Sequence, residues 1–188
     1  LIEAKGKKAK VAAHFSLDAA KKTILIIGGS QGARSINQAV LAGLDRLAEA
    51  GIQVIWQTGI AFESTAKEAV SIPENTYVSA FIYEMDLAYA MADLVISRAG
   101  ASSVSEICLL GKASILIPLP GAAEDHQTEN AKSLVSQNAA ILVRDSEVKE
   151  SLITEALRAI QSDLSSIEKN SLRLAKPNAA HEIAQSIL

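Results

Sequence analysis

One stretch decides the fold: Ile96-Ser97-Arg98-Ala99-Gly100-Ala101-Ser102-Ser103-Val104-Ser105-Glu106. A short apolar strand, 94–96, runs into these small residues, and from Val104 onward apolar residues recur at the spacing of a helix. A strand followed by a Gly/Ser turn and a helix is where α/β proteins bind anions, because free N–H groups and the positive end of the helix dipole point out of the turn. We therefore expect an α/β fold with a ligand at this turn.

Strands and helices alternate along the rest of the chain. Short apolar runs predict strands at 23–27, 54–56, 77–79, 94–96, 114–117 and 140–143. Helical spacing predicts helices at 34–50, 61–70, 86–91, 106–110 and 125–136, then two or three more with a break at Pro177 and a last helix over 178–188. This alternation is typical of a Rossmann-like, doubly wound parallel sheet of about six strands, which binds ligands at the carboxyl ends of its strands.

Length and composition favour one globular domain in a reducing compartment. The chain has 188 residues, a net charge of -3 and a single cysteine, so we expect no nucleic-acid partner, no disulfide framework and a cytoplasmic location. No apolar run is long enough to span a membrane. Residues 1–22 are weakly patterned and lysine-containing, which predicts a linker before a domain at 23–188. The start at Leu1 rather than Met indicates a piece of a longer protein.

The loop Gly28-Gly29-Ser30-Gln31-Gly32-Ala33 allows several interpretations. It lacks the G-x-G-x-x-G spacing of dinucleotide sites, and the next strand ends in Gln57-Thr58-Gly59 with no acid for a ribose. It lacks the lysine of a P-loop. It does match the nucleophile elbow G-x-S-x-G, with Ser30 as the nucleophile, but no preceding strands supply an oxyanion loop. A backbone that approaches a phosphate is the better functional interpretation, and a plain turn is the alternative.

A serine hydrolase built on Ser30 would also need an acid and a base. The acid would come from Asp125 or Asp145 and the base from His181. We keep this as a less favoured hypothesis.

Glu106 has two competing interpretations. Ser103-Val104-Ser105-Glu106 fits the capping box, in which the glutamate reaches back to cap its own helix. Alternatively the carboxylate accepts hydrogen bonds from a pair of sugar hydroxyls, since both of its oxygens are acceptors. The sequence pattern does not separate the two.

The helix at 125–136 begins with a second group of polar residues. Asp125 is suited to the N-cap, while Gln127 and Asn130 are three apart and share one face. Amides both donate and accept, so this pair suits sugar hydroxyls. The three histidines are not spaced as metal ligands and Cys108 stands alone on an apolar helix face, so we expect no metal site.

Taken together, these motifs resemble the MurG family, the bacterial transferases that convert lipid I to lipid II. The matching segments are Ile26–Arg34, Ile96–Ala101, Glu106 and Asp125–Ala131, in family order over residues 23 to about 145. The resemblance implies a GT-B fold, of which this chain would be the C-terminal, donor-binding half. The family's N-terminal acceptor domain and its catalytic histidine have no counterpart here.

The resemblance also implies roles for particular residues. Ser30, with Gln31 in the same loop, would lie near the donor diphosphate, and the backbone of Ile82 would read the uracil. The positions from Ala101 to Glu106 resemble the segment that holds the diphosphate and ribose, with Ser102 and Ser103 contributing backbone groups. Gln127 and Asn130 would bind the hydroxyls of N-acetylglucosamine.

The function implied is donor binding in peptidoglycan synthesis, without a cofactor or metal. The intact enzyme would transfer N-acetylglucosamine from UDP with inversion to lipid I, as a peripheral protein on the cytoplasmic face of the inner membrane. With no catalytic residue expected in this chain, the fragment alone would be inactive. The alternatives are another UDP-sugar transferase, such as the catalytic subunit of a two-chain eukaryotic enzyme, the serine hydrolase, and a non-catalytic nucleotide-binding or interaction module.

Overall fold

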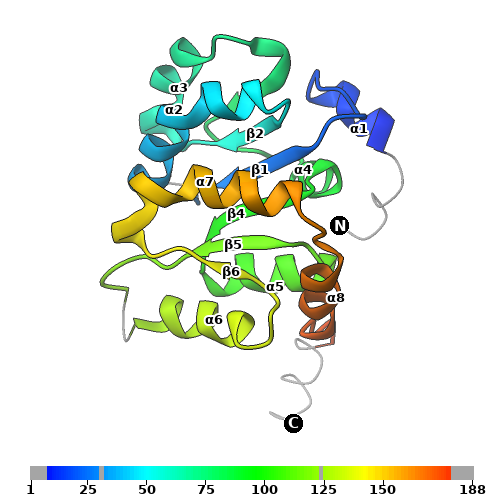
Figure 1. Cartoon of the computed structure of the whole chain (residues 1–188), viewed down its shortest axis with the longest axis vertical. Coiled ribbons are helices and arrows are strands. Elements are labelled where there is room, and N and C mark those ends of the chain that lie inside the picture. Colours follow the sequence, from blue (N-terminus) through cyan, green and yellow to red (C-terminus); the bar gives the residue numbers. More distant parts are fainter. Residues whose placement is uncertain (1–7, 30–31, 123–124, 179–188) are drawn as a thin grey trace.

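The computed structural model describes residues 8–29, 32–122 and 125–178, over which helices and strands alternate (Figure 1). The strands are β1 (Thr23–Ile27), β2 (Gln53–Gln57), β3 (Thr76–Ser79), β4 (Leu94–Arg98), β5 (Ser114–Ile117) and β6 (Ile141–Leu142). The α-helices are α1 (Lys8–His14), α2 (Arg34–Glu49), α3 (Glu63–Ala69), α4 (Met85–Met91), α5 (Ala101–Leu110), α6 (His126–Val135), α7 (Val148–Gln161) and α8 (Ser165–Arg173). Short 3-10 turns are η2 (Ile60–Phe62), η3 (Pro73–Asn75) and η5 (Asp145–Glu147).

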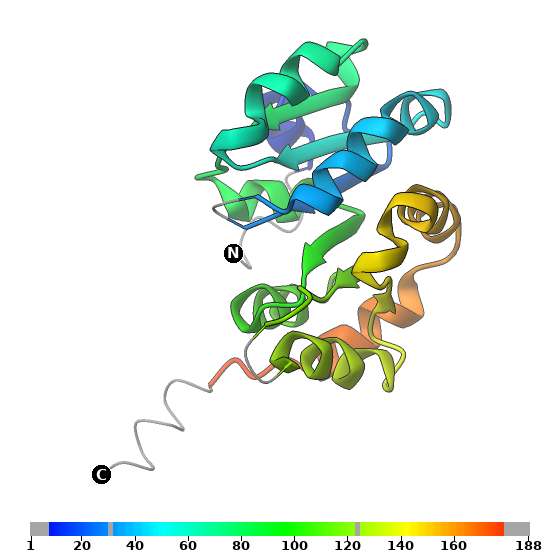
Figure 2. The same ribbon diagram turned by 90° about the vertical axis from the view of Figure 1, so that its left-hand side faces the viewer.

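The strands form one parallel sheet in the order β3-β2-β1-β4-β5-β6. Ile24 of β1 is in register with Val54 of β2 on one side and with Leu94 of β4 on the other. The chain therefore builds outward from β1 to β3, then crosses back and builds in the other direction from β4. Such a switch point opens a crevice at the carboxyl ends of the two central strands, which face the viewer in Figure 2. The predicted doubly wound sheet is confirmed.

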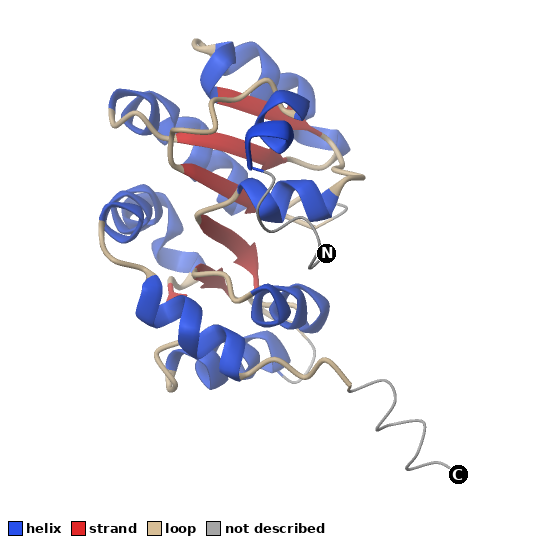
Figure 3. Ribbon diagram, turned by 90° about the vertical axis from the view of Figure 1, so that its right-hand side faces the viewer, coloured by secondary structure: helices blue, strands red, loops and turns tan. Residues whose placement is uncertain are grey.

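Each face of the sheet is covered by helices (Figure 3), and nearly all residues of the four central strands, β2, β1, β4 and β5, are buried. Ile24 and Ile26 pack in one core with α2, α3 and α7, whereas Leu25 and Ile27 pack in the other with α1, α4, α5 and α6. All five residues of β1 are buried, which explains why this strand reads as a continuous apolar run rather than an alternating one.

The N-terminal stretch differs from the expected linker. Within it, residues 8–14 form α1, and Val11, Ala12, Phe15 and Leu17 are buried in the core that contains Leu25. The aromatic ring of Phe15 meets that of Tyr77 edge-on, with centroids 4.9 Å apart. The helix is too short for a helical period to be recognised in the sequence. Its apolar residues could therefore not be predicted to pack against the sheet.

Of the remaining expectations, one concerns described residues and another concerns residues outside the described ranges. The buried position of Cys108 is confirmed, and burial raises the pKa of its thiol. The final helix predicted over 178–188 lies outside the described residues, apart from Asn178. Over the described ranges, no helix is both long and apolar enough to span a membrane.

Candidate functional site

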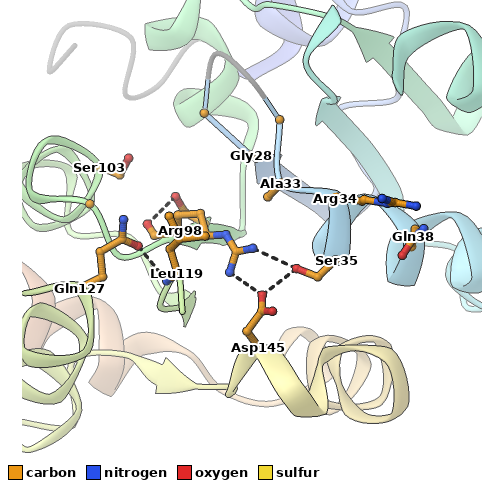
Figure 4. A pocket seen from close by; sticks show the side chains of 14 residues that line it. Gly28, Ala33, Arg34, Ser35, Gln38, Arg98, Ser103, Leu119, Gln127 and Asp145 are labelled. Atoms are coloured by element: carbon orange, nitrogen blue, oxygen red, sulfur yellow. Dashed lines mark hydrogen bonds and ion pairs between the residues drawn. The ribbon is translucent and has the colours of Figure 1, made fainter. Parts of the chain in front are cut away.

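A cavity of about 690 Å³ opens at the switch point between β1 and β4 (Figure 4). Its walls are the turn after β1, the start of α2, the end of β4, the first turn of α5 and the residues after β5. The described lining residues are Gly28, Gly29, Gly32, Ala33, Arg34, Ser35, Gln38, Ser97, Arg98, Gly100, Ser103, Leu119, Gln127 and Asp145. The stretch that predicted an anion site thus forms one wall of the cavity.

The turn after β1 comes close to β2, and this approach requires glycine. Gly32 has a φ of +76°, and a Cβ atom there would lie 2.2 Å from the carbonyl oxygen of Thr58. Gly29 also has a positive φ, of +78°. Side chains at these positions would be strained, and at Gly32 one would also push the turn off the sheet. The glycines therefore serve to bring the backbone to the cavity wall.

Two helix N-termini contribute unpaired backbone donors to this wall. The first hydrogen bond within α5 runs from the N–H of Val104 to the carbonyl of Gly100, at 3.0 Å. The first one within α2 runs from Asn37 to Ala33, at 2.8 Å. The three N–H groups that precede each of these bonds have no acceptor within their own helix. In α5 these groups belong to Ala101, Ser102 and Ser103, and of the three residues Ser103 lines the cavity. Converging donors and dipoles of this kind favour an anion.

A partly buried ion-pair network, formed by Ser35, Arg98 and Asp145, joins the walls of the cavity (Figure 4). Arg98 Nη1 donates to Asp145 Oδ1 at 2.6 Å, and Arg98 Nη2 donates to Ser35 Oγ at 2.9 Å. Ser35 Oγ in turn donates to Asp145 Oδ1 at 2.6 Å. Nη1 also reaches the carbonyls of Ile117 and Pro118, at 3.3 and 3.2 Å. The network thereby connects the start of α2, the ends of β4 and β5, and η5.

The capping-box interpretation of Glu106 is wrong. α5 begins at Ala101, five residues before the predicted start, with Gly100 at the N-cap and no side chain capping the helix. Ser103 is therefore already inside the first turn, and Glu106 is too far along to cap the N-terminus. Instead, Glu106 Oε2 accepts a hydrogen bond from the hydroxyl of Tyr89 on α4, at 3.1 Å. One carboxylate oxygen remains for another donor.

The environment of Tyr89 keeps its hydroxyl as a donor to Glu106 Oε2. Its side chain is 1% exposed, and burial, with the nearby charge of Glu106, raises the pKa of the phenol well above its usual value. The hydroxyl therefore stays protonated, and it orients the Glu106 carboxylate from the protein side.

The two amides predicted as sugar ligands, Gln127 and Asn130, both lie near the start of α6 but have different surroundings. Gln127 lines the cavity, and its Oε1 accepts the N–H of Leu119 at 3.0 Å. Asn130 does not line it: its Nδ2 donates to the carbonyl of Ala99 at 3.0 Å, directly before α5. Asp125 takes the expected N-cap position, but its Oδ1 accepts the hydroxyl of Thr128 at 2.6 Å, not a backbone N–H.

The other predicted site residues lie farther from the cavity or cannot be placed. Ile82 is buried in the loop after β3, and its N–H is taken by Gln57 Oε1 at 3.0 Å, so only its carbonyl is left for a ligand. Ala101, Ser102 and Glu106 do not line the cavity, although they belong to the helix that does. Ser30 and Gln31 lie outside the described residues.

The hydrolase hypothesis receives no support from the two candidate acids. Asp145 is paired with Arg98, and Asp125 is hydrogen-bonded to Thr128. The candidate nucleophile Ser30 and base His181 are outside the described residues. Within the described ranges, no cluster of three or more His, Cys, Asp or Glu side chains is arranged to hold a metal ion.

Sequence reasoning missed four residues that shape the site: Ser35, Gln57, Tyr89 and Arg98. The signal for Arg98 was present, because a charged residue at the end of a buried strand at the switch point needs a partner. The partner, 47 residues away, carried no local signal.

Comparison with known proteins gives the family. Residues 23–187 match the glycosyltransferase family 28 C-terminal domain. A transferase of Parabacteroides distasonis, named UDP-N-acetylglucosamine--N-acetylmuramyl-(pentapeptide) pyrophosphoryl-undecaprenol N-acetylglucosamine transferase, is 44% identical over 192 residues, covering 100% of this chain and 52% of its own length. The protein of the same name from Bacteroides thetaiotaomicron is 49% identical over 181 residues, covering 93% of this chain and 48% of that protein.

The structural comparison agrees with this assignment. The crystal structure of Acinetobacter baumannii MurG superposes with a TM-score of 0.76 at 31% identity, over 96% of this chain and 52% of that one. The chain thus spans about half the length of the relatives it matches, and its fold is that of the C-terminal half of a GT-B glycosyltransferase. The match covers the predicted sheet and every wall of the cavity. The chain therefore belongs to glycosyltransferase family 28 and contains that family's C-terminal domain.

Proposed function

We propose that this chain binds UDP-N-acetylglucosamine as the donor half of the enzyme that converts lipid I to lipid II. The whole enzyme would transfer the sugar, with inversion, to the C4 hydroxyl of the lipid-linked muramyl-pentapeptide. The names of the relatives describe this donor and this acceptor. The acceptor site and the catalytic base would lie in the other half of such an enzyme, which would be peripheral on the cytoplasmic membrane face.

The observation that carries the proposal is the convergence of the N-termini of α2 and α5 on one cavity at the switch point. A nucleoside diphosphate sugar carries its negative charge on the diphosphate at its centre, so the donors on either side suit it. Ser30 and Gln31 would also bind the diphosphate. During transfer, charge develops on the departing UDP, and fixed N–H donors stabilise that charge without reorganising. No metal is needed for this role.

The two ends of the donor would extend in opposite directions from the diphosphate. On one side, the free oxygen of Glu106 would accept the ribose hydroxyls, and the carbonyl of Ile82 would contact the uracil. On the other, Gln127 still has its amide nitrogen, which Figure 4 shows turned away from Leu119, and Asn130 still has its Oδ1. These groups would bind hydroxyls of the sugar.

Calorimetric titration of the chain with UDP-N-acetylglucosamine, UDP-glucose and NADH tests the proposal. We expect binding of the first, weaker binding of the second and none of NADH. Equal binding of both UDP-sugars would favour another UDP-sugar transferase, and binding of NADH without any uridine nucleotide would overturn the proposal. Treatment with a fluorophosphonate tests the hydrolase alternative, and we expect Ser30 to stay unlabelled.

A further inference from the structure

A single buried amide connects the two loops that the proposed function assigns to opposite parts of the nucleotide. Gln57, the last residue of β2, is 2% exposed. Its Nε2 donates to the carbonyl of Gly29 in the turn after β1, at 3.2 Å. Its Oε1 accepts the N–H of Ile82 in the loop after β3, at 3.0 Å. A side-chain amide provides both a donor and an acceptor on one short planar group.

The surrounding backbone shows that both loops are built on the end of β2. The N–H groups of Thr58 and Gly59 donate to the carbonyls of Ser79 and Ala80, each at 3.0 Å, which fixes the loop after β3. On the other side, Asn37 Nδ2 donates to the carbonyl of Thr58 at 2.7 Å, against which Gly32 is packed. Gln57 is the side chain that joins these two sets of contacts.

The residue at the end of the second strand has a different role in related folds. In dinucleotide-binding sheets, the end of the second strand carries an acid that binds a ribose hydroxyl. Here the side chain is turned into the protein and both of its polar atoms are bonded to backbone. It is therefore placed to hold protein segments, not to bind a ligand itself.

We propose that Gln57 is a positioning residue that fixes the distance between the turn at Gly29 and the loop at Ile82, and so couples diphosphate binding to base binding. This inference rests on the proposed function, since it takes the ligand to be a uridine diphosphate. A ligand that contacts both loops binds more tightly when the loops are already held in place, because ordering them on binding lowers the affinity. A fragment that contacts one loop gains little.

The test compares Gln57→Met with Gln53→Met in this chain. Gln53 is a matched control: it is buried on the same strand, and its amide also makes two backbone hydrogen bonds, both to Asp18, at 2.7 and 2.8 Å. Methionine conserves the volume of either side chain. We titrate each variant with UDP, uridine and inorganic pyrophosphate, and measure amide hydrogen exchange at Ile82 and Gly32 without ligand.

In Gln57→Met we expect the affinity for UDP to fall about tenfold or more, while those for uridine and pyrophosphate change by about twofold or less. Exchange should accelerate at Ile82 and at Gly32, whose N–H donates to Gly29 at 3.1 Å. Gln53→Met should leave all of these unchanged. Gln57→Glu, which keeps the acceptor for Ile82 but not the donor to Gly29, should accelerate exchange at Gly32 alone.

Two results would overturn the inference. A parallel loss of affinity for all three ligands in Gln57→Met would indicate general destabilisation, and unchanged exchange at both amides would show that Gln57 does not position the loops. Failure of the unmodified chain to bind UDP would instead overturn the proposed function. The exchange rates measured without ligand test the positioning role of Gln57 independently of that result.

Discussion

Replacing Arg98 with alanine is expected to lower the free energy of unfolding by about 3 kcal/mol, because it leaves the partly buried carboxylate of Asp145 without its charged partner. The side chains of Arg98 and Asp145 are only 14% and 21% exposed, so solvent screens the pair weakly. The variant also loses the donors to the carbonyls of Ile117 and Pro118. Urea unfolding followed by circular dichroism measures the change.

Two further variants show whether the loss of stability comes from the partly buried ion pair between Arg98 and Asp145. Arg144→Ala removes another arginine, whose side chain is 74% exposed and pairs with Glu147 on the surface, and should cost about 0.5 kcal/mol or less. Arg98→Met combined with Asp145→Leu removes both charges and should recover part of the loss. A cost for Arg98→Ala no larger than that for Arg144→Ala would contradict this account of the network.

Replacing Glu106 with glutamine is expected to weaken UDP binding by about 10- to 100-fold, since hydrogen bonds to a charged acceptor contribute roughly 1.5–3 kcal/mol. The melting temperature should change little, because Glu106 caps no helix and glutamine can still accept from Tyr89. Calorimetry with UDP and with its 2′-deoxy analogue measures the effect. If the carboxylate binds the ribose, removing the 2′-hydroxyl should matter less in the variant than in the unmodified chain.

Tyr89→Phe is the control for this prediction. It removes the internal donor to Glu106 but leaves the carboxylate, so UDP affinity should fall about fivefold or less. The ribose assignment fails if Glu106→Gln binds UDP as well as the unmodified chain does.

The sheet was predictable because its signals are local. The apolar run at 23–27 predicts a strand buried on both faces, and the structure buries all five residues. The break after α2 was equally visible, since Gly51 follows the last apolar position and has a φ of +72°. The order of the strands then placed the cavity at the switch point by the general rule for such sheets.

The side-chain details of the site were not predictable, because they depend on partners far apart in sequence. Ser103 and Glu106 fit a capping box only if the helix starts at Ser103, and nothing local showed that Gly100 would be the N-cap. Glu106 instead pairs with Tyr89, which sequence analysis could not place opposite it. At Gln57 the sequence showed only that the acid expected to bind a ribose is absent. The hydrogen-bond partners of this side chain are backbone groups of two other loops.

Mapping by backbone amide NMR shows directly whether UDP binds in the cavity between the starts of α2 and α5. On titration with UDP, we expect the largest shift changes at Gly28, Gly29, Gly100, Ala101 and Ser103, with smaller ones at Ile82. Changes confined to the separate cavity beside Phe15 and Tyr77, or no saturable change at any residue, would contradict the claim.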